Sequence, residues 1–258
     1  NRAVQGGDPE AQRLSISPVS SQRYAIGADY AHEGQDFSTM CWGKGCKLLG
    51  FEEKARTRTE VFAHWVSEKY YELGDRKTEV GADGNGPGAG ACDVLERGAK
   101  FLVNGEEFVV RKVSRLNRMT HKDPTYMLKF KDAPKFDNLR SQMWWRFRED
   151  MERGLIDLSW LASEECNYDG VEELQAEILA HTYETVNGTL RIVSKRDLRK
   201  SGVLGRSPDR ADALVIWNWV RRRDAVIGAG DYHDEILIRG VQQRRKLLRD
   251  LGDGSGWV

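Results

Sequence analysis

Three aspartates stand in settings where a carboxylate can do chemistry. Asp29 and Asp83 each end a short apolar run, and the glycine-rich segment 84–90 follows Asp83. Asp212 lies near the start of a predicted helix. A carboxylate at the end of a buried strand is costly unless a positive partner meets it. Hard divalent cations prefer carboxylate oxygens, so the pattern favours a metal centre of Asp29, Asp83 and Asp212.

Such a centre matches the needs of phosphodiester hydrolysis. The reaction requires an activated water and a stabilised leaving oxygen, and two metal ions about 3.5–4 Å apart can supply both. We therefore expect two Mg²⁺ or Mn²⁺ ions, held by side chains that the fold brings together from distant parts of the chain.

Two further carboxylates could join this centre. Ser207 and Pro208 are good first residues of a helix, which puts Asp209 in its first turn and on the same face as Asp212. The helix dipole favours an anion there in any case, so Asp209 is either a first-turn anion or an accessory ligand. Asp36 is either a turn residue or an additional ligand.

The element order that carries these residues is typical of an α/β domain. Three strands joined by short connections predict antiparallel pairing, and a helical crossover then makes the fourth strand parallel to an earlier one. The expected strands are 24–29, 36–42, 47–52, 78–83 and 107–113, with a helix ending at Gly74 and another at 91–97. This order describes an RNase H-like fold, a mixed five-stranded sheet flanked by helices. Its fourth strand pairs with its first, which puts Asp29 and Asp83 side by side.

The second half of the chain is mainly helical, with one added β-hairpin. Asn187-Gly188 lies between two β-prone runs and is the strongest short-range signal for a hairpin. We expect helices at 137–153, 171–180 and 207–222. The boundaries predicted are a polar linker or tail at 1–22, the nuclease-like domain at 23–223, and a charged segment at 224–258 with a possible helix at 234–251.

Composition limits the possible partners. Lys plus Arg and Asp plus Glu are both 40 in 258 residues, so DNA binding would need a local basic patch. The four cysteines lack zinc-site spacing and are expected to be reduced thiols. No run approaches the ~20 apolar residues of a membrane span, and no secretory leader is visible.

Two basic clusters could contact phosphate, or could be solvated surface charge. Contacts of this kind give salt-dependent affinity without sequence choice. Lys195 is favoured near the site because it directly follows the hairpin. The first cluster is Arg111, Lys112, Arg115, Arg118, His121 and Lys122, and the second is Lys195, Arg196, Arg199, Lys200 and Arg206.

The segments around the aspartates resemble the nuclease domain of tailed-bacteriophage large terminase subunits, over roughly residues 22–222. The most specific part is Ser207-Pro208-Asp209-Arg210-Ala211-Asp212-Ala213-Leu214. The weaker parts are Ile26-Gly27-Ala28-Asp29-Tyr30-Ala31, Gly34-Gln35-Asp36, the segment 80–88 and Lys195.

The resemblance implies a metal-dependent endonuclease that cuts concatemeric double-stranded phage DNA during genome packaging in the host cytoplasm. It implies that Asp29, Asp83 and Asp212 bind the metals, with Asp209 as an accessory ligand, and that the hairpin lies beside the site. It also implies the portal protein and the small terminase subunit as partners. The family's large subunit carries a packaging ATPase domain, whose GxxxxGK[ST] signature is absent here, so this piece is not expected to translocate DNA.

Other functions remain open on sequence alone. A junction resolvase or integrase would use the same fold on other DNA substrates. An actin-like phosphotransferase shares the sheet topology and an early strand-end aspartate, but the chain shows no second copy of the fold. A non-catalytic DNA-binding module would use the acidic residues for structure only.

Overall fold

The centre of the molecule is a mixed five-stranded sheet. The computed structural model describes residues 23–31, 36–74, 77–97, 101–103, 106–110, 113–116, 135–200 and 202–221. The sheet has the order β3-β2-β1-β4-β7, formed by β1 (Tyr24–Asp29), β2 (Phe37–Lys44), β3 (Lys47–Ala55), β4 (Glu79–Asp83) and β7 (Val113–Leu116). β2 pairs antiparallel with β1 and β3, whereas β4 pairs parallel with β1 and β7. The predicted RNase H-like arrangement is confirmed.

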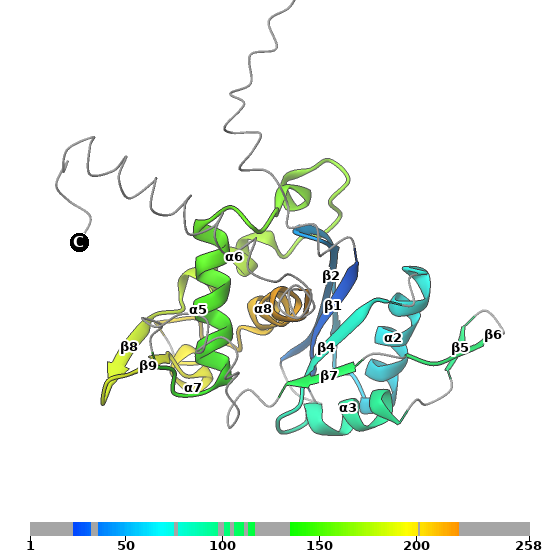
Figure 1. The fold of residues 1–258 in the computed structure, drawn as a ribbon, viewed down its shortest axis with the longest axis horizontal. Helices are drawn as coiled ribbons and strands as arrows, with labels where there is room; N and C mark the ends of the chain where they lie inside the picture. The colour runs from blue at the N-terminus through cyan, green and yellow to red at the C-terminus, as the bar shows by residue number, and fades with distance from the viewer. Residues whose placement is uncertain are drawn as a thin grey trace, which may run out of the picture.

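Helices cover both faces of this sheet. α2 (Thr59–Glu72) and α3 (Gly88–Glu96) lie on one face, and α8 (Asp209–Arg221) lies on the other (Figure 1). α5 (Leu139–Glu152) packs against the outer side of α8, which is therefore enclosed between the sheet and a second helix. None of the helices in the described ranges combines the length and apolar composition that a membrane crossing requires.

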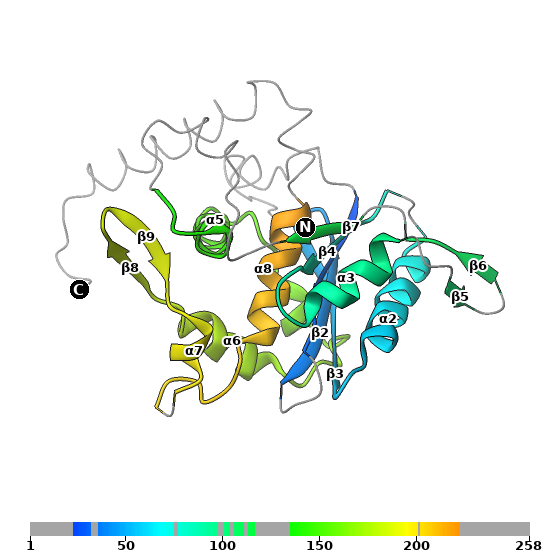
Figure 2. The same ribbon diagram turned by 90° about the horizontal axis from the view of Figure 1, so that it is seen from below.

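The predicted Asn-Gly hairpin is confirmed. β8 (Tyr183–Val186) and β9 (Thr189–Ile192) pair antiparallel, and Asn187 and Gly188 have φ values of 51° and 72°. Positive φ at both central residues is the conformation of the type I′ turn, one of the two common two-residue hairpin loops. Figure 2 shows the hairpin projecting away from the main sheet, next to α7 (Lys195–Leu198). The remaining elements of this half are η2 (Ser159–Ala162) and α6 (Val171–Leu179).

The prediction of the fifth strand at 107–113 is wrong in position. β6 (Glu106–Phe108) pairs with β5 (Phe101–Val103) in a separate two-stranded sheet, and the fifth strand of the main sheet is β7. The sequence between β5 and β6 is Asn104-Gly105, a second hairpin signal that the prediction overlooked. The predicted segments 1–22 and 224–258 lie outside the described residues.

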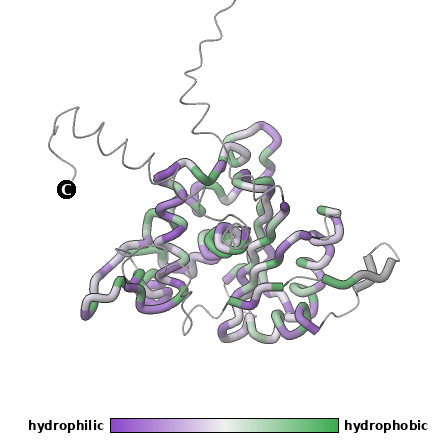
Figure 3. The backbone as a smooth tube through the Cα atoms, in the orientation of Figure 1, coloured by the Kyte–Doolittle hydropathy of each residue, from purple (hydrophilic) through white to green (hydrophobic). Residues whose placement is uncertain are grey.

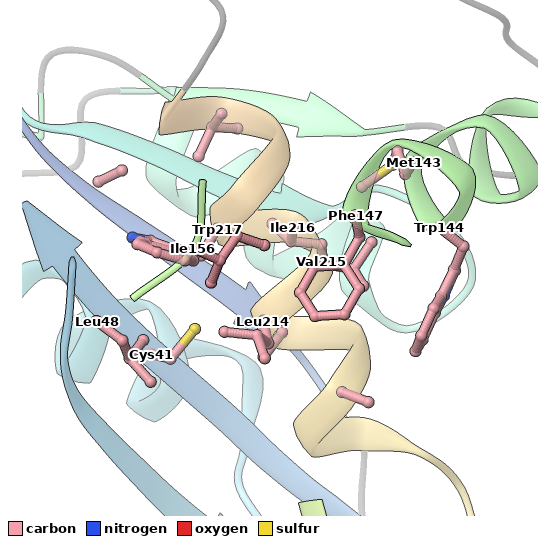
Figure 4. Close-up of a cluster of buried hydrophobic side chains, with 14 of the residues drawn as sticks. Cys41, Leu48, Met143, Trp144, Phe147, Ile156, Leu214, Val215, Ile216 and Trp217 are labelled. Atoms are coloured by element: carbon pink, nitrogen blue, oxygen red, sulfur yellow. The ribbon is translucent and has the colours of Figure 1, made fainter. Parts of the chain in front are cut away.

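Two hydrophobic clusters hold the layers together. Figure 4 shows Leu214 and Trp217 of α8 on the side of the sheet residues Cys41 and Leu48, and Phe147 of α5 on the side of α8 that faces α5. The second cluster packs α2 and α3 on the opposite face. Figure 3 colours much of α5 as hydrophilic, although Arg140, Gln142 and Asp150 of this helix are buried. α5 therefore brings polar side chains into the interior, and each must be paired there.

Glycines on the sheet allow α8 to approach closely. A Cβ on Gly27 would lie 2.3 Å from the backbone oxygen of Ala213 and 2.3 Å from the backbone nitrogen of Trp217. A Cβ on Gly81 of β4 would meet the side chains of Val220 and Ile216 at 2.6 and 2.8 Å. Because the atoms opposite Gly27 are backbone, the helix itself would have to move.

Gly27→Ala should therefore destabilise the protein. We expect the free energy of unfolding to fall by roughly 1–3 kcal/mol or more, because the added methyl overpacks the contact between β1 and α8. Urea unfolding followed by tryptophan fluorescence measures the change. Gly90→Ala is the matched control: Gly90 is exposed in α3, and a Cβ there meets only Thr59 Cγ2 at 3.5 Å. The control should be neutral or stabilising by up to about 1 kcal/mol, and equal losses in the two variants would contradict the close-approach explanation.

Candidate functional site

The sheet places Asp29 and Asp83 next to each other. Ala28 of β1 pairs with Ala82 of β4 in parallel register, so the two aspartates follow at the carboxyl ends of neighbouring strands. Side chains alternate along a strand, so each aspartate points to the same face as the glycine two residues before it, and those glycines lie against α8. Asp29 is buried and Asp83 is half-buried.

Asp212 enters the site from α8. Its side chain is fully buried, which is costly for a carboxylate without donors. Trp144 of α5 supplies one, since its Nε1 donates to Asp212 Oδ1 at 3.2 Å. Arg140, also on α5, has Nη2 3.8 Å from the same oxygen. The polar side of α5 is thus what makes a carboxylate tolerable in the middle of the core.

Lys195 joins the sheet aspartate to the helix aspartate. Its Nζ lies 3.1 Å from Asp29 Oδ2 and 2.7 Å from Asp212 Oδ2. Lys195 was predicted as a DNA contact close to the site, and the structure places it directly between two of the predicted metal ligands. The ammonium group shows that these two oxygens converge on a position that suits a cation.

Asp209 lies close to the same group of charges. It is buried at the start of α8, and its Oδ2 accepts a hydrogen bond from the backbone N–H of Phe37 at 3.2 Å. Burial, followed by the negative charge of Asp29, raises the pKa of Asp209 to about 7. Asp36, the other additional candidate, forms an ion pair with Arg199.

Asp83 is engaged by the loop that follows it. Its Oδ1 accepts hydrogen bonds from the backbone N–H of Asn85 at 3.1 Å and from Asn85 Nδ2 at 2.9 Å. In the part of the chain that the structure describes, no group of three His, Cys, Asp or Glu side chains is arranged to hold a metal ion. The centre of Asp29, Asp83 and Asp212 therefore stays a prediction, with two of its members connected through Lys195.

Sequence reasoning missed the residues that support Asp212. His181 stacks on Trp144 with ring centroids 3.5 Å apart, and its Nε2 lies 3.0 Å from Arg140 Nη2. Burial, together with the positive charge of Arg140, lowers the pKa of His181 to about 4. The ring is then neutral at pH 7, and Nε2 accepts from the guanidinium while Nδ1 donates to the Glu177 carbonyl at 2.6 Å. Helical spacing identified Trp144 as a core residue, which is confirmed, but spacing carries no information on its indole N–H.

The predicted DNA contacts lie in different surroundings. Arg196 is exposed and lines a cavity of about 530 Å³ between the hairpin and α7, which Arg191 and Lys200 also line. Arg115 on β7 forms ion pairs with Asp93 and Glu96 of α3. Arg199 pairs with Asp36, as described above. Arg111 and Lys112 lie outside the described residues, as do Arg118, His121 and Lys122.

Asp209 predicts a pH dependence of stability. Its folded-state pKa of about 7 lies above the ordinary value of 3.8, so the folded chain binds this proton more tightly than the unfolded chain. The stability from this group is complete below a pH of about 4 and is lost as the pH rises towards 7. Asp209→Asn should remove this component, so the wild type should lose more stability than the variant over that range. Urea unfolding of both proteins between pH values of about 4 and 8 measures it, and parallel curves would contradict the assignment.

Comparison with known proteins gives a structural match. No family model matches the sequence, and no curated protein matches it. The nuclease domain of the large terminase subunit gp2 of bacterial virus Sf6 superposes with a TM-score of 0.57 at 18% identity, covering 75% of this chain and 86% of that one. A mutant of gp2c from bacteriophage Sf6 with calcium gives a TM-score of 0.60 at 17% identity, with coverage of 75% and 86%.

A third structure agrees with these two. It is a mutant of the Sf6 gp2 nuclease domain with manganese and β-thujaplicinol, with a TM-score of 0.59, 17% identity and coverage of 76% of this chain and 87% of that one. This chain has the fold of the nuclease domains of phage large terminase subunits.

Proposed function

We propose that this chain is a metal-dependent endonuclease that cleaves concatemeric double-stranded phage DNA during genome packaging. The observation that carries the proposal is the convergence of Asp29 and Asp212 on one ammonium group, at the strand end where Asp83 also lies. The fold supports it, because the similar Sf6 domains are nucleases and two of them were solved with manganese or calcium.

The donor set fits a hard divalent cation. Two carboxylate oxygens already face one positive charge, and oxygen ligands are what Mg²⁺ and Mn²⁺ prefer. We propose that Asp29, Asp83 and Asp212 hold two such ions, with Asp209 as an accessory ligand. When bound, the ions would supply an activated water and stabilise the leaving oxygen.

The chain's own residues prepare this chemistry. Trp144 and Arg140 fix Asp212 Oδ1, which leaves Oδ2 directed at Lys195. With the carboxylates neutralised by metal, the ammonium of Lys195 no longer has to compensate them and can face a DNA phosphate. The backbone N–H of Phe37 orients Asp209. The site would therefore offer Lys195 to an anionic DNA phosphate and the carboxylate oxygens to divalent cations.

DNA would approach over the surface formed by the hairpin and α7. Arg196 lines the cavity there, next to Lys195. We propose Lys195, Arg196 and Arg199 as phosphate contacts, and Arg111, Lys112 and Arg115 as a second set. The portal protein and the small terminase subunit are the proposed protein partners, in the host cytoplasm.

One observation favours a second candidate, a non-catalytic DNA-binding module. Lys195 already compensates Asp29 and Asp212, so these acids could serve the structure without a metal. Titration with Mn²⁺ separates the two functions, since the module would show neither heat of binding nor a thermal shift. Cutting of branched DNA in preference to linear duplex would instead indicate a junction resolvase.

Asp83→Asn tests the catalytic proposal. The amide oxygen can still accept both hydrogen bonds from Asn85, so the fold should persist while the negative charge for the metal is lost. We expect plasmid cleavage in Mn²⁺ to be abolished, with an unchanged circular dichroism spectrum. Glu72→Gln is the control, because Glu72 is an exposed acid on α2, on the sheet face opposite α8, where it pairs with Lys69. Normal cleavage by the Asp83 variant would end the proposal.

Arg196→Gln tests whether DNA binds over the surface formed by the hairpin and α7. Removing one phosphate contact should weaken binding about equally for all sequences and lower the slope of log affinity against log salt concentration by about 1. Fluorescence anisotropy of a labelled duplex, without divalent metal, measures both. Arg148→Gln is the control, since Arg148 is an exposed arginine on α5 paired with Glu152. Equal slopes for wild type and the Arg196 variant would exclude this contact.

A further inference from the structure

Outside the proposed metal ligands, Glu177 is a fully buried acid that the proposed chemistry does not use. It lies on α6, and its side chain has an exposed fraction of 0%. A carboxylate in such a place needs strong compensation. The groups that contact this carboxylate lie in the first turn of α8 or just before it.

One contact of Glu177 is with the backbone of α8. Glu177 Oε2 accepts a hydrogen bond from the N–H of Ala211 at 2.9 Å. The first N–H groups of a helix have no acceptor within the helix, and the helix dipole favours an anion there. Glu177 therefore acts as the N-terminal cap of α8, although it comes from a different helix 34 residues away.

Two arginines complete the compensation of Glu177. Its Oε1 pairs with Arg206, just before α8, and lies 3.3 Å from Arg210 Nη1, in the first turn. Arg210 Nε in turn lies 2.6 Å from Glu53 Oε1 of β3 and 3.0 Å from the hydroxyl of Tyr168. The network thus fastens the start of α8 both to α6 and to the edge of the sheet.

This network lies next to the acids that α8 brings to the proposed metal centre, so it can affect their positions as well as the stability of the fold. Ala211 lies between Asp209 and Asp212, the two acids that α8 brings to the site. The segment leading into α8 contains Gly202 and Gly205, both with positive φ, and residues 202–208 form neither helix nor strand. The carbonyl of Glu177 also accepts from His181, which orients Arg140 beside Asp212. Glu177 is therefore connected to Asp212 in two ways: through the Ala211 N–H in the first turn of α8, and through His181 and Arg140.

We propose that Glu177 is a positioning residue for the metal centre. It acts through the Ala211 N–H and Arg210, and fixes the first turn of α8 so that Asp209 and Asp212 face Asp29. This inference rests on the proposed function. Partners that orient ligands in this way typically change metal affinity by roughly 10–100-fold when removed.

Glu177→Gln is the decisive variant. It keeps an oxygen that can accept from Ala211 but removes the charge that holds Arg206 and Arg210. We expect Mn²⁺ affinity in calorimetric titration to fall by about 10–100-fold, and the Mn²⁺ concentration for half-maximal DNA cleavage to rise by the same factor. DNA affinity without divalent metal should not fall, because the variant keeps Lys195, Arg196 and Arg199 and removes a negative charge beside Arg206.

Asp150→Asn provides a matched control. Asp150 is an equally buried acid that contacts the other end of α8, where it accepts from Asn218 at 3.0 Å and lies 3.5 Å from Arg146. Both variants remove one buried charge next to the same helix, so both should unfold at lower urea concentration. Only Glu177→Gln should weaken Mn²⁺ binding; equal Mn²⁺ affinities in the two variants would show a structural role alone and overturn the inference.

Two further outcomes are informative. If the wild type binds Mn²⁺ and cuts DNA, the proposed function stands whatever the variant does; if it does neither, the proposed function and this inference fall together. Should Glu177→Gln not fold, Arg210→Gln decides, because Arg210 carries one of the two proposed routes from Glu177 to the first turn of α8. Weaker Mn²⁺ binding than in Asp150→Asn supports the inference, and unchanged binding overturns it.

Discussion

The structure depends on the compensation of negative charge inside the core. Asp29 and Asp212 are buried and face each other between the sheet and α8, and Lys195 is the positive group between them. Isolated buried carboxylates would be too costly to retain, so the surrounding elements are arranged to supply donors. Trp144 and Arg140 do this from α5, and the Phe37 N–H does it for Asp209. The polar residues of α5 are thereby explained, since an apolar helix there would leave Asp212 Oδ1 without the donors Trp144 and Arg140.

The need to compensate buried charge also determines how the outer helices α5 and α6 contact α8. α6 contributes Glu177 at the start of α8, while Asp150 of α5 meets Asn218 near its end. Polar contacts therefore hold both ends of this helix, and its middle is held by apolar packing and by close contact with Gly27. A helix fixed in this way can present side chains from its first turn with little freedom, as a metal centre requires.

Local signals in the sequence predicted most of the fold. The antiparallel strands, the parallel fourth strand, the Asn187-Gly188 hairpin and α8 all follow from periodicity, turn residues and capping. The strand at 107–113 was misplaced because a second Asn-Gly signal was overlooked. The side-by-side placement of Asp29 and Asp83 was predicted from topology alone. The Lys195 and Glu177 contacts were not, because residues 166 and 34 positions apart meet only through the assembled layers.

Lys195 lies only three residues beyond the end of β9, and this short connection has a mechanical consequence. The intervening Val193 is fastened on both sides, since its N–H donates to Thr182 and its carbonyl accepts from Arg140. The base of the hairpin, and with it the backbone that leads to Lys195, is therefore tied to α5, the same helix whose Trp144 and Arg140 support Asp212. One helix thus sets the positions of both the ammonium group and the carboxylate that it meets.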